Sequence, residues 1–147
     1  MRSTRWVMRL AGLSLMVACG GSDASSPTPA FPALDGAWSI QGTFNDFAAN
    51  VASFSGTVTF DQPSRNQPEI TATASVTVVI SGSSSTITVI SAPAITTAGL
   101  LTFNLNVPNA ASTWAFTGSV SGTAANGTHV LAGSGSSFPG VWQATHP

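Results

Sequence analysis

The chain has 147 residues, enough for one domain, and only 6% of them are charged, against about 25% in ordinary soluble domains. It contains no lysine, and its basic residues are four arginines. Because nucleic-acid binding needs a cationic surface to neutralise phosphates, this composition excludes a nucleic-acid partner.

The N-terminal region has the layout of a secretory signal peptide. Arg2, Arg5 and Arg9 precede a short apolar run from Leu10 to Val17, and the small residue Ala18 leads to Cys19, the only cysteine of the chain. A membrane span would need roughly 20 apolar residues, so this run predicts a signal rather than a transmembrane helix.

The segment Met16-Val-Ala-Cys19-Gly20 resembles the lipobox of bacterial lipoproteins. The resemblance implies that residues 1–18 are a signal peptide and that Cys19 becomes an acylated N-terminus, carrying palmitate-type chains. Durable anchoring needs more than one such chain. Gly20 after the cysteine implies, by the same resemblance, sorting to the outer membrane of the bacterial envelope.

Residues 19–33 are expected to form a flexible linker, because Gly, Ser and Pro dominate them and no apolar periodicity is present. Residues 34–147 are expected to form a single all-β domain. Within it, apolar and polar residues alternate with a period of two over 38–45, 53–60 and 70–80, which is typical of strands with one buried face.

Further strands are expected over Thr86–Ser91, Leu100–Val107, Ser112–Thr123, Thr128–Gly133 and Phe138–Thr145, giving about eight in total. Turns are expected at Gly82–Ser85, Ala98-Gly99, Pro108-Asn109 and Asn126-Gly127, the last as a type I′ hairpin turn. Short turns predict an antiparallel meander. A closed barrel removes exposed edges and is favoured over a two-sheet sandwich. The absence of Tyr and the single, scattered Trp residues argue against a membrane-spanning barrel.

The first predicted strand begins Gly36-Ala-Trp38, a Gly-x-Trp that resembles the start of lipocalins, whose eight-stranded barrels carry small apolar ligands. The resemblance implies a tryptophan inside the barrel. Aromatic side chains either fill a core or line a pocket. The candidate ligand-binding residues are therefore Trp38, Trp114, Trp142 and Phe116.

Residues suited to catalysis are few. His129 and His146 are the two histidines, and an enzyme would require His129 to meet a carboxylate such as Asp35 or Asp46 in a cleft. We find no Gly-x-Ser-x-Gly, no phosphate-binding loop and no spacing of metal ligands. The sequence thus predicts no enzyme, no cofactor and no metal.

The functional expectation is a non-catalytic, lipid-anchored envelope lipoprotein that acts through surface interactions. The second hypothesis is a lipocalin-like carrier that holds a small apolar ligand inside the barrel. The space inside the barrel separates the two, since a filled interior favours the first and an open cavity favours the second.

Overall fold

The structure is a computed structural model, and it describes residues 30–46, 50–107, 112–133 and 135–147. The signal peptide, Cys19, most of the linker and the turn expected at Pro108-Asn109 lie outside the described residues. Within the described part, no helix is long and apolar enough to cross a membrane.

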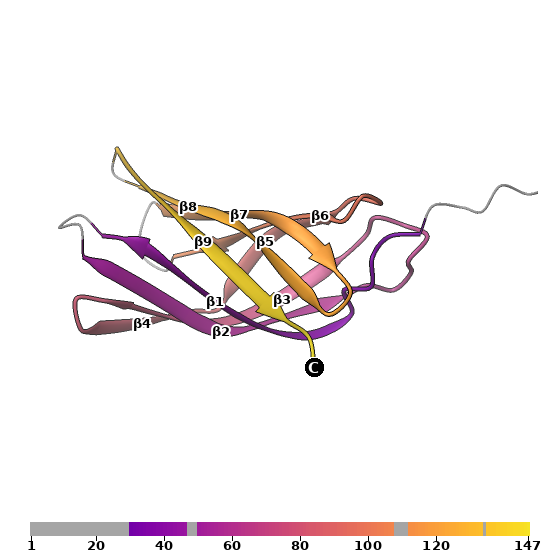
Figure 1. The fold of residues 1–147 in the computed structure, drawn as a ribbon, viewed down its shortest axis with the longest axis horizontal. Helices are drawn as coiled ribbons and strands as arrows, with labels where there is room; N and C mark the ends of the chain where they lie inside the picture. Colours follow the sequence, from indigo (N-terminus) through magenta and orange to yellow (C-terminus); the bar gives the residue numbers. More distant parts are fainter. Residues whose placement is uncertain (1–29, 47–49, 108–111, 134) are drawn as a thin grey trace, which may run out of the picture.

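The described residues form nine strands joined as one antiparallel meander, as Figure 1 shows. The strands are β1 (Gly36–Asn45), β2 (Val51–Asp61), β3 (Thr71–Ile80), β4 (Ser83–Ile87), β5 (Val89–Ile95), β6 (Leu100–Asn106), β7 (Ser112–Ser121), β8 (Ala124–Gly133) and β9 (Ser136–Thr145). Their order in the sheet is β4-β3-β2-β1-β9-β8-β7-β6-β5. The expected all-β meander is confirmed.

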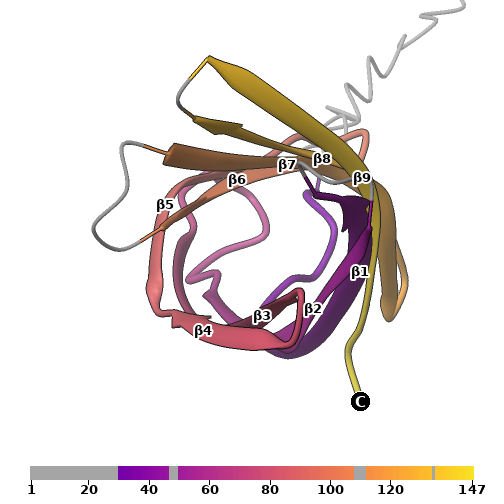
Figure 2. The same cartoon turned by 90° about the vertical axis from the view of Figure 1, so that its left-hand side faces the viewer.

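The sheet curls strongly on itself, so the architecture is barrel-like and not a two-sheet sandwich (Figure 2). Its two end strands, β4 and β5, follow each other in the chain. β5 also contacts β3, the neighbour of β4, so the two ends of the sheet come together. The hydrogen-bonded ladder is nevertheless open at this seam. On the other side of β5, its register with β6 shifts between Ser91 and Ala94, where Ala92 has a φ of +49° and Pro93 has no N–H to donate.

The seam also explains why the strand count differs from the expected eight. The predicted strand Thr86–Ser91 contains a corner at Thr88, where β4 ends at Ile87 and β5 starts at Val89. Periodicity predicts both halves as one run, because Ile87 and the residues after the corner are equally β-prone.

The turn predicted at Asn126-Gly127 is wrong, since both residues lie within β8. The β7–β8 hairpin turns four residues earlier, at Gly122-Thr123, where Gly122 has a φ of +60°. Gly127 serves close packing instead: a Cβ there would collide with the carbonyl oxygen of Thr117 and the Cα of Gly118. The turn expected at Gly82–Ser85 is shifted: the chain turns at Ser81-Gly82, and Ser83–Ser85 already belong to β4. Ala98-Gly99 precedes β6 as expected.

Aromatic side chains fill the inside of the barrel. The large buried rings come from β1, β2, β6, β7 and β9, and they are Trp38, Phe44, Phe54, Phe60, Phe103, Trp114, Phe116 and Trp142. Each such burial stabilises the fold by roughly 1.5–3 kcal/mol, which suits a domain with no disulfide among its described residues.

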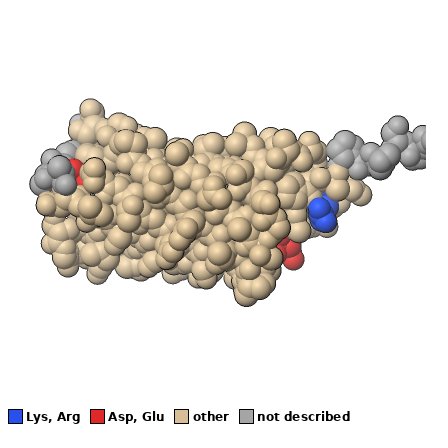
Figure 3. All heavy atoms as spheres, viewed as in Figure 1, with Lys and Arg blue, Asp and Glu red and all other residues tan. Residues whose placement is uncertain are grey.

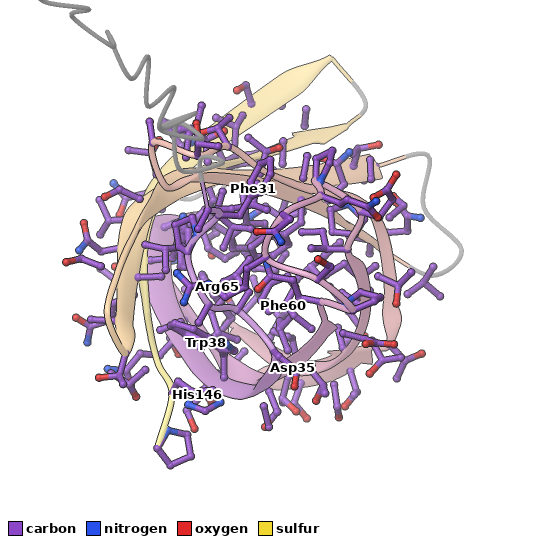
Figure 4. All side chains as sticks on the ribbon, turned by 90° about the vertical axis from the view of Figure 1, so that its right-hand side faces the viewer. Phe31, Asp35, Trp38, Phe60, Arg65 and His146 are labelled. Carbon is purple, nitrogen blue, oxygen red and sulfur yellow. The ribbon has the colours of Figure 1, made fainter. Side chains whose placement is uncertain are left out.

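One end of the barrel is covered by the segment that precedes β1 (Figure 4). Phe31 and Arg65 exchange two hydrogen bonds, from Phe31 N to Arg65 O at 2.8 Å and from Arg65 Nε to Phe31 O at 2.7 Å. Leu34 is fully buried, and its N–H donates to Gln62 Oε1 at 2.9 Å. Phe31 also packs against the core, and it lies within residues 19–33, where the sequence predicts a linker.

Candidate functional site

The structure brings three of the four predicted aromatic residues together. Trp114 and Phe116 lie on β7 with ring centroids 5.3 Å apart, and Phe116 is 6.0 Å from the ring of Trp142 on β9. Phe103 of β6 stacks on Phe116 at 4.7 Å. Each of these rings is at most 3% exposed. The rings thus contact one another at the place where an apolar ligand would have to lie.

The fourth predicted residue, Trp38, lies apart from this cluster at the covered end of the barrel (Figure 4). Its Nε1 donates to the carbonyl of Leu34 at 2.7 Å, and its ring lies 5.3 Å from that of His146. The chain after β9 is held there too, because His146 N donates to Thr123 O at 2.8 Å. Trp38 closes the end of the barrel together with Leu34 and His146.

Trp142 is set against two glycines. It is the register partner of Gly127 on β8, and a Cβ at Gly118 on β7 would come within 2.6 Å of the indole. Its Nε1 donates to the carbonyl oxygens of Thr117 at 3.2 Å and Thr128 at 3.0 Å. These backbone bonds satisfy the indole, so its polar atom is not free for a ligand inside the barrel.

His129 is a buried member of the aromatic cluster and is 1% exposed. Trp114 Nε1 donates to His129 Nδ1 at 2.8 Å, so Nδ1 is the acceptor and the proton of the neutral ring is on Nε2. Nε2 then donates to the carbonyl of Thr43 at 3.1 Å. Burial lowers the pKa of His129, and the hydrogen bond to Thr43 raises that pKa by a smaller amount.

The carboxylates considered as catalytic partners do not meet His129. Asp35 and Asp46 flank β1 on opposite sides, which places them about 35 Å apart at the usual strand rise. Asp35 accepts from Gln62 N, whereas Asp46 accepts from Asn50 N and Ser81 Oγ. No group of three or more potential metal ligands occurs within residues 30–46, 50–107, 112–133 and 135–147.

A groove of about 850 Å³ lies on the outer face of the sheet, over β3, β2, β1, β9 and β8. Its polar lining comes from outward-pointing positions: Gln41, Thr43, Ser53, Ser55, Thr77, Asn126, Thr128 and Gln143. Val79 and Val141 add apolar surface, while Gly42, Gly127, Phe54 and Trp142 complete the lining. A smaller hollow of about 130 Å³ adjoins it and shares Gln41 and Gln143.

The groove is uncharged. Every lining residue is neutral, and Figure 3 shows one face of the molecule with charged atoms only towards its two ends. The charges near the covered end include Asp35, Asp61, Arg65 and Glu69, and Asp46 lies at the opposite end of β1.

The sequence does not predict this groove, because the aromatic candidate residues that it suggests lie on the buried faces of the strands. Most of the residues that line it are Ser, Thr, Gln and Asn on the solvent-facing side of their strands, and their proximity depends on the pairing of β1 with β9. The one feature of the sequence that points to the groove is the lack of charged residues on the solvent-facing sides of these strands.

No protein-family model, curated protein or solved structure matches this chain.

Proposed function

We propose that this protein is a non-catalytic lipoprotein of the bacterial cell envelope, anchored by acyl chains on Cys19, that binds its partner through the outer face of its barrel. The observation that carries the proposal is that the open space lies outside the barrel and not inside it. The interior is filled by rings in mutual contact, and a groove of about 850 Å³ lies outside, on the uncharged face.

The filled interior weighs against the carrier hypothesis. A carrier needs an apolar space of roughly 300–1,000 Å³ that buries most of its ligand. Trp114, Phe116 and Trp142, which were candidates for lining such a space, are instead packed against each other and against Phe103.

The anchor is tested by metabolic labelling. Cells that express the full chain are grown with radioactive palmitate, and the Cys19→Ala variant is the matched control. We expect label in the wild-type protein and none in the variant. Label that persists in Cys19→Ala, or its absence from both proteins, contradicts the proposed anchor.

The outer face is tested by sedimentation of the Cys19→Ala chain with isolated cell envelopes, since this chain lacks the acylation site. Ser55→Trp places a bulky ring in the groove, and Thr59→Trp places the same ring on the exposed face of β2 outside it. We expect Ser55→Trp to abolish co-sedimentation and Thr59→Trp to retain it. Equal binding by both variants contradicts recognition through the groove.

A further inference from the structure

We infer that the outer groove binds a neutral oligosaccharide chain, whose hydroxyl groups are recognised by a row of side-chain amides. This inference rests on the proposed function, because it names the ligand class of the same face. The row consists of Gln41 on β1, Gln143 on β9 and Asn126 on β8, and these three residues are called the amide row below.

The amide row follows from strand register. Gln41 pairs with Gln143, and Gln143 pairs with Asn126, so the three side chains are direct neighbours across three strands. Directly opposed residues in antiparallel strands have Cβ atoms about 4.5–5.5 Å apart. The row therefore presents amides at a regular spacing along the floor of the groove.

These amides are available to a ligand. Among the described residues, none of the three side-chain amides hydrogen bonds to another protein group. Each amide offers two N–H donors and one carbonyl acceptor. A sugar hydroxyl both donates and accepts, so neighbouring hydroxyls on a ring match an amide better than they match a charged group.

The surroundings of the amide row suit the rest of a sugar ring. In the adjacent row, Val141 lies between Thr43 and Thr128 and is 60% exposed. Val79 lies opposite Ser53 and is 40% exposed. Such apolar side chains can cover the C–H faces of a pyranose while the flanking hydroxyls bind its edges.

The shape favours a chain over a single small molecule. The smaller hollow continues from Gln41 and Gln143 to Ser39 and Thr145, along the same two strands. The two hollows meet at the Gln41–Gln143 pair, so together they follow β1 and β9. An extended ligand can occupy both.

The lining of the groove disfavours three competing ligand classes. No lining residue carries a charge, so an anionic polymer would lose hydration without gaining an ion pair. A lipid would leave the amides without partners. A protein interface usually has aromatic or arginine residues at its centre, whereas Trp142 in this groove is only 3% exposed. A neutral polyhydroxylated chain fits these conditions.

The experiment is isothermal titration calorimetry of the full chain carrying Cys19→Ala. The probes are the neutral hexaoses of glucose (β1,4 and α1,4), mannose and N-acetylglucosamine, with hexagalacturonic acid as the anionic comparison. We expect at least one neutral hexaose to bind and the galacturonic acid hexamer to bind at least about tenfold more weakly, because its carboxylates gain no charged partner.

The matched variants test the amide row. Gln41→Leu combined with Gln143→Leu removes two amides, and we expect affinity to fall by about tenfold or more. Gln143→Glu keeps the size of the side chain but adds charge, and we expect it to weaken binding as well. Gln67→Leu changes an exposed glutamine in the β2–β3 connection, outside the groove, and should leave affinity unchanged.

The outcomes separate this inference from the proposed function. If no neutral hexaose binds, or if the double variant binds as well as the wild type, the oligosaccharide inference is overturned. If Ser55→Trp still abolishes co-sedimentation with envelopes in that case, recognition through the groove stands with a different ligand. If Ser55→Trp has no effect on either assay, both proposals fail.

Discussion

His129 shows how a residue type associated with catalysis can serve the core. It accepts a hydrogen bond from Trp114 and donates one to Thr43, and the rings of Phe44, Phe54 and Phe116 surround it. Protonation would place a hydrogen on Nδ1 directly opposite the indole N–H. The folded state therefore holds His129 neutral, in agreement with its lowered pKa.

This arrangement predicts acid-sensitive stability. The pKa of His129 is lowered on folding from 6.5, so the unfolded chain binds the proton more readily. The free energy of unfolding should be constant above pH 6.5, and it should fall as the pH drops below that value. Urea unfolding followed by tryptophan fluorescence between pH 5 and 8 measures the effect.

Two variants assign that pH dependence to His129. His129→Gln should remove most of the dependence, at a cost in overall stability from the altered hydrogen bonds. His146→Gln, which changes the half-buried histidine that packs on Trp38 after β9, is the comparison variant. A profile that is unchanged in His129→Gln would show that another group is responsible.

The sequence indicates the burial of these residues better than it indicates their roles. His129 lies in phase with Ala125 and Gly127 on the inward face of β8, which marks it as a core position. Its partners cannot be read from that phase, because Thr43 and Trp114 come from strands whose register with β8 or β9 the sequence does not specify.

At the scale of strands, glycines on the inward faces let the sheet pack closely around Trp142. Gly42 on β1 and Gly127 on β8 are its register partners on either side, and Gly118 on β7 pairs with Gly127. A Cβ at Gly42 would collide with the ring of Phe54 and the carbonyl oxygen of Val141. Here the indole occupies the space that side chains on the neighbouring strands would otherwise fill.

Gly127→Ala is therefore expected to destabilise the domain by about 1–3 kcal/mol or more, because its Cβ meets backbone atoms that cannot rotate away. Gly122→Asn provides the comparison on the same hairpin. Gly122 has open space around it and a φ of +60°, a conformation that Asn tolerates, so this change should cost less than about 1 kcal/mol. Chemical denaturation of both variants decides the point; equal losses would argue against close packing at Gly127.

The seam between β4 and β5 is expected to be the least protected part of the sheet. Each of these strands has a hydrogen-bonded neighbour on one side only, β3 for β4 and β6 for β5. Amide hydrogen exchange should be faster in Ser83–Ile87 and Val89–Ile95 than in β1 and β9, which are paired on both sides. Uniform protection across all of these strands would indicate a closed ladder.

The element level is where sequence patterns were most informative. Alternation located β1, β2 and β3 to within a few residues, because one face of each strand is buried. It failed at Thr88, where a corner interrupts a run of β-prone residues, and at Asn126-Gly127, where a typical turn pair lies inside a strand. In both places tertiary packing overrides local preference.

At the scale of the whole molecule, the packed interior predicts a flat response to apolar ligands. The described domain contains Trp38, Trp114 and Trp142, which are 1–3% exposed. We expect tryptophan emission typical of buried indoles and no saturable change with fatty acids or apolar probes at micromolar concentration. Saturable quenching that is lost on substitution of Phe116 would instead restore the carrier hypothesis.

The candidate site illustrates the limit of prediction at this scale. Strand phase shows that Gln41, Asn126 and Gln143 face water, but their alignment in one row requires β1, β9 and β8 to be neighbours. A closed meander makes the first and last strands neighbours, but the register in which they pair sets the alignment of the row, and periodicity does not encode that register.

The confinement of charge to the two ends of the barrel has a consequence for the speed of recognition. A ligand that approaches the outer face of the barrel meets no long-range electrostatic attraction. Its association rate constant should therefore be of the order of 10⁵–10⁶ M⁻¹s⁻¹, as in encounters without electrostatic steering. Ionic strength should hardly alter that rate, although the screening length falls from about 30 Å at 0.01 M salt to about 3 Å at 1 M. Stopped-flow measurements at these two concentrations should give the same rate constant within about twofold. The uncharged outer face would therefore let the protein bind its ligand as fast at high salt as at low salt.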